Sequence, residues 1–137
     1  MRRLLILPLL AALAAGPSVA EKPSAEAVQQ RNDAKLAKLL KGLEPAGTEQ
    51  CIKLRFTNNT TQRVGDTILY RVSPKLVYRT DTGGGCDGLE RGDPIVLRTF
   101  NGQLCRGDIA QTVSPVGGLP SGTCTIGTFT TYRAPAK

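Results

Sequence analysis

Four cysteines constrain the fold of this chain more than any other feature of its sequence. Cys51, Cys86, Cys105 and Cys124 all lie in the last two thirds of its 137 residues. None of them has another cysteine at the close spacing of a zinc knuckle, and the chain contains no histidine, so a zinc site would need all four thiolates from distant places. We therefore expect two disulfide bonds, which persist in an oxidising compartment.

The N-terminal residues predict export to such a compartment. Two arginines precede an apolar run from Leu4 to Ala15, and Ser18-Val19-Ala20 provides the small residues of a cleavage site. This pattern is typical of a secretory signal peptide over residues 1–20, because Gly16 and Pro17 interrupt the apolar run before it could span a bilayer. An uncleaved N-terminal anchor is the alternative. No other run is apolar enough to cross a membrane, so we expect a periplasmic or secreted protein with no transmembrane segment after cleavage.

Cleavage at that site leaves 117 residues, which suit one domain that benefits from covalent cross-links. The net charge falls from +7 to +5, because Arg2 and Arg3 leave with the leader. This basic body predicts an anionic partner, such as a lipid surface or a cell-wall polymer, or an envelope protein. We expect no nucleic acid as partner, because few aromatic rings are available to stack on bases.

Residues 21–48 are expected to form an amphipathic helix and a linker. The helix should run from Ser24, a suitable N-cap, to Lys41, where Gly42 stops it. Its contact stripe recurs at helical spacing and consists of Asn32, Leu36, Leu39, Leu40 and Leu43, with lysines 35, 38 and 41 away from it. We expect the helix to pack on its own domain or to fray as a tether; docking to a partner or an anionic membrane is the alternative. Pro45, Gly47 and Thr48 are expected to form the linker.

Residues 49–133 are predicted to form a β domain, and residues 134–137 a disordered tail. Short β-rich runs alternate with turn residues, among them CIKLRFT, DTILYRV, KLVYRTD and GTCTIGTFTTYR. The echo between Leu69-Tyr70-Arg71 and Val77-Tyr78-Arg79 is typical of a symmetric antiparallel hairpin. We predict a mainly β fold: a small antiparallel sheet or barrel of about six strands, held by disulfides, with one N-terminal helix outside.

The triplet Arg-Gly-Asp occurs twice, at 91–93 and 106–108, which raises the question of an adhesion ligand. Asn101-Gly102 between them is a strong type I′ hairpin signal, because both positions need positive φ. The predicted register pairs Arg98 with Cys105 and Val96 with Gly107. In that register the first triplet is the loop that enters the hairpin and the second lies within the returning strand. An extended triplet cannot sit at a loop tip, so we expect no receptor binding by the second copy; receptor binding by the first copy is the alternative.

Four cysteines can pair in three ways. Cys51 and Cys105 both sit in strand-like runs, whereas Cys86 and Cys124 both sit beside glycine-rich loops. Pairing like with like gives Cys51–Cys105 and Cys86–Cys124. The loop Gly83-Gly84-Gly85 could suggest a phosphate cradle, but it lacks the lysine of a P-loop and no helical pattern follows it. We interpret it as a bend held by the disulfide at Cys86.

The last ninety or so residues contain a series of short motifs in a fixed order: CI.L, DTILYR, VYR, GD.IV.RTF, QLC..D and G.F..YR. On the basis of these motifs, this part of the chain resembles a group of small exported proteins of alphaproteobacteria. These are mostly labelled hypothetical, within a wider domain-of-unknown-function family. The resemblance implies export and a compact domain, and it brings no catalytic residues. In relatives of this kind the cysteines that match Cys51 and Cys105 can occur alone, which fits the pairing above.

Little in the sequence indicates catalysis, and no cofactor or metal is expected. Without histidine, a hydrolase would depend on carboxylates, whose candidates mostly occupy turn positions where they serve local hydrogen bonds: Asp66, Asp81, Asp87, Glu90, Asp93 and Asp108. We therefore predict a non-enzymatic binding or structural module of the cell envelope, with Arg71 and Arg79 as an anionic-partner patch if they are cross-strand neighbours. The alternatives are a secreted hydrolase inhibitor that inserts a rigid loop, either 83–87 or 114–123, and a carboxylate-dependent hydrolase.

Overall fold

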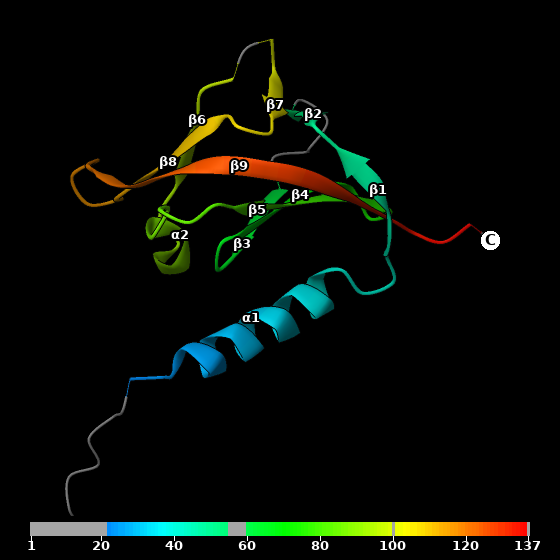
Figure 1. Cartoon of the computed structure of the whole chain (residues 1–137), viewed down its shortest axis with the longest axis horizontal. Helices are drawn as coiled ribbons and strands as arrows, with labels where there is room; N and C mark the ends of the chain where they lie inside the picture. The colour runs from blue at the N-terminus through cyan, green and yellow to red at the C-terminus, as the bar shows by residue number, and fades with distance from the viewer. Residues whose placement is uncertain (1–21, 55–59, 100, 137) are drawn as a thin grey trace, which may run out of the picture.

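The computed structural model describes residues 22–54, 60–99 and 101–136, and within them the chain forms two helices and nine strands (Figure 1). The predicted signal peptide lies outside the described residues, as does the end of the run CIKLRFT. The elements are α1 (Ala25–Leu39), β1 (Glu44–Glu49), β2 (Cys51–Lys53), β3 (Thr60–Val64), β4 (Thr67–Ser73), β5 (Leu76–Thr82), α2 (Gly88–Arg91), β6 (Ile95–Leu97), β7 (Gln103–Cys105), β8 (Ile109–Val113) and β9 (Pro120–Arg133).

The long strand β9 organises the sheet. Its C-terminal half pairs with β5 on one side and with β1 on the other, while its N-terminal half pairs with β8. The resulting antiparallel sheet has seven strands: six in the order β3-β4-β5-β9-β8-β6, and β1, which pairs with β9 off this path. β2 and β7 form a separate two-stranded sheet. The sheet curls into a half-barrel, and the Arg63 side chain of β3 donates a 2.6 Å hydrogen bond to the Asp93 carbonyl, two residues before β6. The predicted fold class is confirmed.

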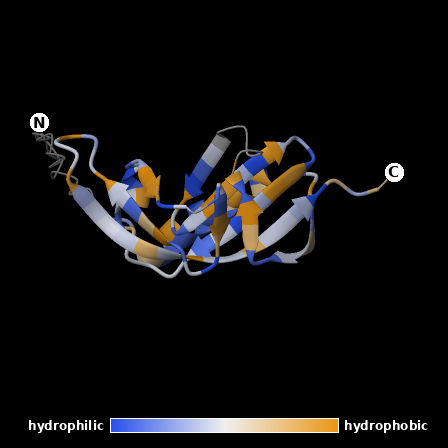
Figure 2. Cartoon of the chain, turned by 90° about the horizontal axis from the view of Figure 1, so that it is seen from above, coloured by the Kyte–Doolittle hydropathy of each residue, from blue (hydrophilic) through white to orange (hydrophobic). Residues whose placement is uncertain are grey.

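The two faces of the curled sheet bury different clusters. The inner cluster contains Ile68, Tyr70, Ile126 and Phe129, with the Tyr70 and Phe129 rings in an edge-to-face contact at 6.2 Å. Successive side chains of a strand point to opposite faces, so Ile68 and Tyr70 join this cluster while Leu69 of the same strand joins the outer one. Figure 2 shows the hydrophobic segments on the strands in the body of the molecule. Tyr70 lies opposite Tyr78 in the β4–β5 hairpin, as the echo in the sequence predicted.

Helix α1 covers the outer face of β3, β4 and β5 (Figure 1). Ser24 caps it as predicted, because its Oγ accepts a 3.2 Å hydrogen bond from the Ala27 amide, and the helix ends two residues before Lys41. Leu36 is buried against Val64, Leu69 and Val77, so the helix packs on its own domain. The apolar stripe that the sequence predicts on this helix is therefore an internal packing surface.

The predicted linker is wrong for Pro45 to Thr48, because these residues belong to strand β1. β1 lies at an edge, where proline is tolerated because its missing N–H faces away from the ladder. The register of β1 against β9 shifts between Pro45 and Thr48, where Gly47 has a φ of +131° that permits a bulge.

The predicted 95–108 hairpin is also wrong. Asn101 and Gly102 have the expected positive φ values of 57° and 67°, yet β6 pairs with β8 and β7 pairs with β2. Cys51 lies directly opposite Cys105, so their disulfide holds β7 to β2. Consequently the second Arg-Gly-Asp is a turn between β7 and β8, with Gly107 at φ +90°, rather than a strand segment.

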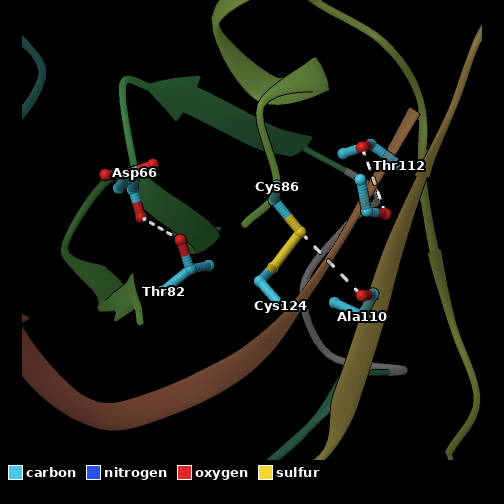
Figure 3. The surroundings of a disulfide bond; sticks show 7 residues. Asp66, Thr82, Cys86, Ala110, Thr112 and Cys124 are labelled. Atoms are coloured by element: carbon cyan, nitrogen blue, oxygen red, sulfur yellow. Dashed lines mark hydrogen bonds between the residues drawn. A yellow bond between two sulfur atoms is a disulfide. The ribbon is translucent and has the colours of Figure 1, made fainter. Parts of the chain in front are cut away.

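Both predicted disulfides are confirmed, Cys51–Cys105 and Cys86–Cys124. Figure 3 shows the second one, which ties the glycine-rich bend to β9, with the Cys86 sulfur 3.8 Å from the Ala110 carbonyl oxygen. The bend fits closely, because a Cβ on Gly85 would lie 2.4 Å from the Thr123 carbonyl oxygen. Contrary to the sequence-based expectation, a one-turn helix, α2, follows this bend.

Candidate functional site

Arg71 and Arg79, the predicted anionic-partner patch, each have a partner inside the protein. Both point to the outer face, but they are diagonal neighbours, since Arg71 lies opposite Val77 and Arg79 opposite Leu69. The Arg71 guanidinium donates a 2.8 Å hydrogen bond to the Leu39 carbonyl at the end of α1. The Arg79 guanidinium forms an ion pair with Asp81 at 3.1 Å. The two side chains thus hold the helix and the hairpin, and anion binding by them stays a prediction.

A larger cationic cluster lines a groove between α1, β3 and α2. Two adjoining hollows of about 380 and 340 Å³ share Lys35, Arg63, Leu89 and Glu90 in their walls. The cationic groove, as we call it, is lined by four cationic side chains, Arg31, Lys35, Arg63 and Arg91, and by one carboxylate, Glu90. Its walls therefore carry an excess of positive charge.

Local structure sets the positions of these four cations. Arg31 and Lys35 are four residues apart on α1 and so lie on the same side of the helix, and the Arg31 Nε donates to the Ala27 carbonyl at 3.3 Å. Arg63 is fixed by its hydrogen bond to the Asp93 carbonyl, which uses one of its five N–H donors. Arg91 ends α2 and stays largely exposed at the rim, 3.2 Å from the Asp93 carboxylate.

Asp93 anchors the arginine side of this groove. Its side chain is buried, with 8% of its surface exposed, and its backbone amide donates to the Gly88 carbonyl. The Ser121 hydroxyl, helped by the guanidinium groups of Arg91 and Arg63, holds the pKa of Asp93 below its usual value of 3.8. The buried carboxylate is therefore ionised at neutral pH and keeps Arg91 beside the groove. In the first Arg-Gly-Asp the aspartate is thus buried, so this copy cannot serve as an adhesion ligand.

Three of the six carboxylates considered for a hydrolase, Asp81, Asp93 and Asp108, make structural contacts. Asp81 accepts a hydrogen bond from the Thr67 hydroxyl as well as from Arg79, and Asp108 accepts from the Cys105 amide at 2.7 Å. A hollow of about 610 Å³ beside α1 does contain Asp33, Asp66, Asp81 and Glu90 in its walls. Within the described residues, no cluster of three or more acidic or cysteine side chains is arranged to hold a metal ion.

The two loops expected for an inhibitor differ in their exposure. The loop at 83–87 is drawn against β9 by the buried Cys86, so it does not protrude. The other forms the tip of the β8–β9 hairpin, which extends beyond the rest of the sheet at the left of Figure 1. Val116 and Leu119 at this tip are 83% and 68% exposed.

Sequence reasoning did not single out the cationic groove. The spacing of Arg31 and Lys35 on a predicted helix was an available signal, but Arg63 and Arg91 join them only through long-range packing of β3 and α2. No family model matches the chain, and comparisons with curated proteins and with solved structures find no match either. Among the described residues, no helix is long and apolar enough to cross a membrane.

Proposed function

We propose that this protein is an exported, non-enzymatic module of the cell envelope, of the kind that its sequence resembles, and that it binds an anionic ligand in the cationic groove. The observation that carries this proposal is the convergence of Arg31, Lys35, Arg63 and Arg91 from three elements on one groove with a single carboxylate. Two disulfide bonds suit an oxidising compartment, which supports export.

Phosphate is the anion that this groove fits best. Guanidinium groups present several N–H donors in a planar fork that matches phosphate oxygens, and a lysine adds a mobile point charge. The acidic hollow on the other side of Asn32 and Gly65 would repel an anion and confine it to the basic side. A phosphate of this chemistry could belong to a lipid headgroup or to a phosphorylated cell-wall polymer.

The test uses the disulfide-bonded protein and two probes, soluble polyphosphate and vesicles that contain phosphatidylglycerol. The variant Arg31→Gln/Lys35→Gln removes two cations from the exposed wall of the groove, while Lys53→Gln/Lys75→Gln removes two exposed lysines elsewhere. We expect binding that weakens with added salt and that falls about tenfold or more in the first variant but little in the second.

Binding of polyphosphate alone would indicate a polymer ligand, and binding of vesicles alone would indicate a lipid. Equal losses in both variants would mean that net charge, rather than the groove, attracts the anion, and the proposal would fail. Salt-insensitive capture of a single hydrolase, with no affinity for either probe, would instead favour the inhibitor alternative.

A further inference from the structure

The β8–β9 hairpin is the longest uncharged segment of this basic protein. From Ile109 to Tyr132 the sequence contains no Asp, Glu, Lys or Arg, although the chain carries a net charge of +7. Copies of a positively charged protein repel one another wherever like charges meet. This hairpin is therefore the surface on which two copies can approach most closely without that repulsion.

The exposed large aliphatic residues of the described chain fall into two sites on or beside this hairpin. Val116 and Leu119 form the tip, while Val96 and Ile109, 47% and 62% exposed, line a hollow of about 520 Å³ at its base. The base hollow also contains Arg98 and Asp108, one charge of each sign. It is large enough to receive the two aliphatic side chains of a tip.

The tip is preorganised for insertion. The Ser114 hydroxyl accepts a hydrogen bond from the Val116 amide and donates one to the Val116 carbonyl, at 3.2 and 3.0 Å. The Ser114 amide donates to the Leu119 carbonyl at 2.8 Å, and the Gly118 amide donates to the Ser114 carbonyl at 3.2 Å. Because these polar groups are satisfied within the loop, burial of the tip against another surface leaves few of them unpaired.

A tip cannot reach the hollow of its own chain. Val113, where the tip begins, is four residues from Ile109 along β8, a distance of about 14 Å, and the loop leads further away. Two hairpins that lie antiparallel, however, place each tip over the other's hollow. In that arrangement the same tip and the same hollow are used by both copies, which makes the surface self-complementary.

We infer that the protein forms a two-fold symmetric homodimer in which the Val116 and Leu119 tip of each copy inserts into the hollow of the other beside Val96 and Ile109. A lipid surface is a poorer occupant, because the hairpin offers no lysine or arginine for headgroups near its tip. This inference is independent of the proposed anion binding and can fail or hold separately from it.

Sedimentation velocity over a wide range of protein concentration tests the dimer. We expect a reversible monomer–dimer equilibrium whose dissociation constant rises roughly tenfold or more in Val116→Asp and in Ile109→Asp, since each buries a charge in an apolar contact. Gln103→Glu adds the same charge at an exposed position of β7 outside both sites and should leave the equilibrium unchanged. Circular dichroism confirms that each variant is folded.

Mixing the two variants gives the sharpest result. The Val116→Asp chain retains an intact hollow and the Ile109→Asp chain an intact tip, so the mixture restores one of the two contacts and should dimerise more strongly than either variant alone. A wild-type protein that stays monomeric throughout, or a mixture no stronger than its components, overturns the inference.

Discussion

The Cys86–Cys124 disulfide should stabilise the fold more than Cys51–Cys105, although it closes the shorter loop. They close sequence separations of 54 residues for Cys51–Cys105 and 38 for Cys86–Cys124. In the chain-entropy model these loops stabilise the fold by about 4.2 and about 3.9 kcal/mol at 25 °C. Loop length alone therefore favours the first bond by only about 0.3 kcal/mol.

Burial reverses this order. Cys86 and Cys124 are only 1% and 5% exposed within the inner cluster, whereas Cys51 is exposed and Cys105 half-buried. Replacing the buried pair by alanine leaves space where two sulfur atoms packed, at a cost of about 1 to 3 kcal/mol beyond the entropy. We expect Cys86→Ala/Cys124→Ala to lose more free energy of unfolding than Cys51→Ala/Cys105→Ala, by about 1 to 2.5 kcal/mol.

Urea denaturation of the two double variants, each with its other disulfide intact, measures this difference. If the variant without the buried bond is unfolded in buffer, a protective osmolyte such as TMAO, added to both, keeps the comparison possible. Equal losses, or a larger loss for Cys51→Ala/Cys105→Ala, would refute the view that packing outweighs loop length.

Other parts of the structure lead to three further expectations. The surroundings of Asp93 hold its pKa below 3.8, so the ionised carboxylate stabilises the fold above that pH, and this contribution is lost as the pH falls through the pKa of the folded state. Asp93→Asn should therefore weaken the fall of the urea midpoint at acid pH, measured by urea denaturation over a range of pH. Gly122→Ala should cost about 1 to 3 kcal/mol of unfolding free energy, because its Cβ would lie 2.5 Å from the Gly85 carbonyl oxygen. Gly83→Ala, whose nearest contact would be 3.5 Å away, should cost less than about 1 kcal/mol when both variants are unfolded in urea. Burial raises the pKa of Tyr70 well above 10.0, so the neutral Tyr70 side chain contributes fully to stability below pH 10.0, and this contribution is lost as the pH rises above that value. An ultraviolet titration should show one of the three tyrosines ionising only on unfolding.

Local patterns in the sequence were enough to predict several elements. The capped, periodic segment after Ser24 forms α1, and the Tyr70 and Tyr78 echo forms the β4–β5 hairpin, because both depend on interactions between near neighbours in the chain. The cysteine pairing was predicted correctly from the kind of segment around each residue.

The pairing of strands that are far apart in the chain could not be predicted from local patterns. Asn101-Gly102 specifies a turn, but the turn does not decide which strands pair on either side of it. β7 pairs with β2, and β6 pairs with β8, which was not recognised as a strand of its own. β1 was missed because Pro45 and Gly47 look like linker residues, although an edge strand with a bulge accepts both.

The candidate site, too, depends on contacts between distant parts of the chain that local patterns do not reveal. Arg71 and Arg79 were singled out because they are neighbours in a visible hairpin, yet the structure gives each an internal partner. The cationic groove joins Arg31, Lys35, Arg63 and Arg91 from parts of the chain that are up to sixty residues apart. Only the packing of α1 and α2 against β3 brings them together.

The most direct test of anion binding in the cationic groove is a backbone NMR titration of the disulfide-bonded protein with inorganic pyrophosphate. The account predicts saturable shift changes centred on the amides that line the groove, from Arg31 to Lys35, Thr61 to Gly65 and Leu89 to Gly92. Changes centred on Arg71 and Arg79, or small changes spread over all exposed lysines and arginines, would contradict it.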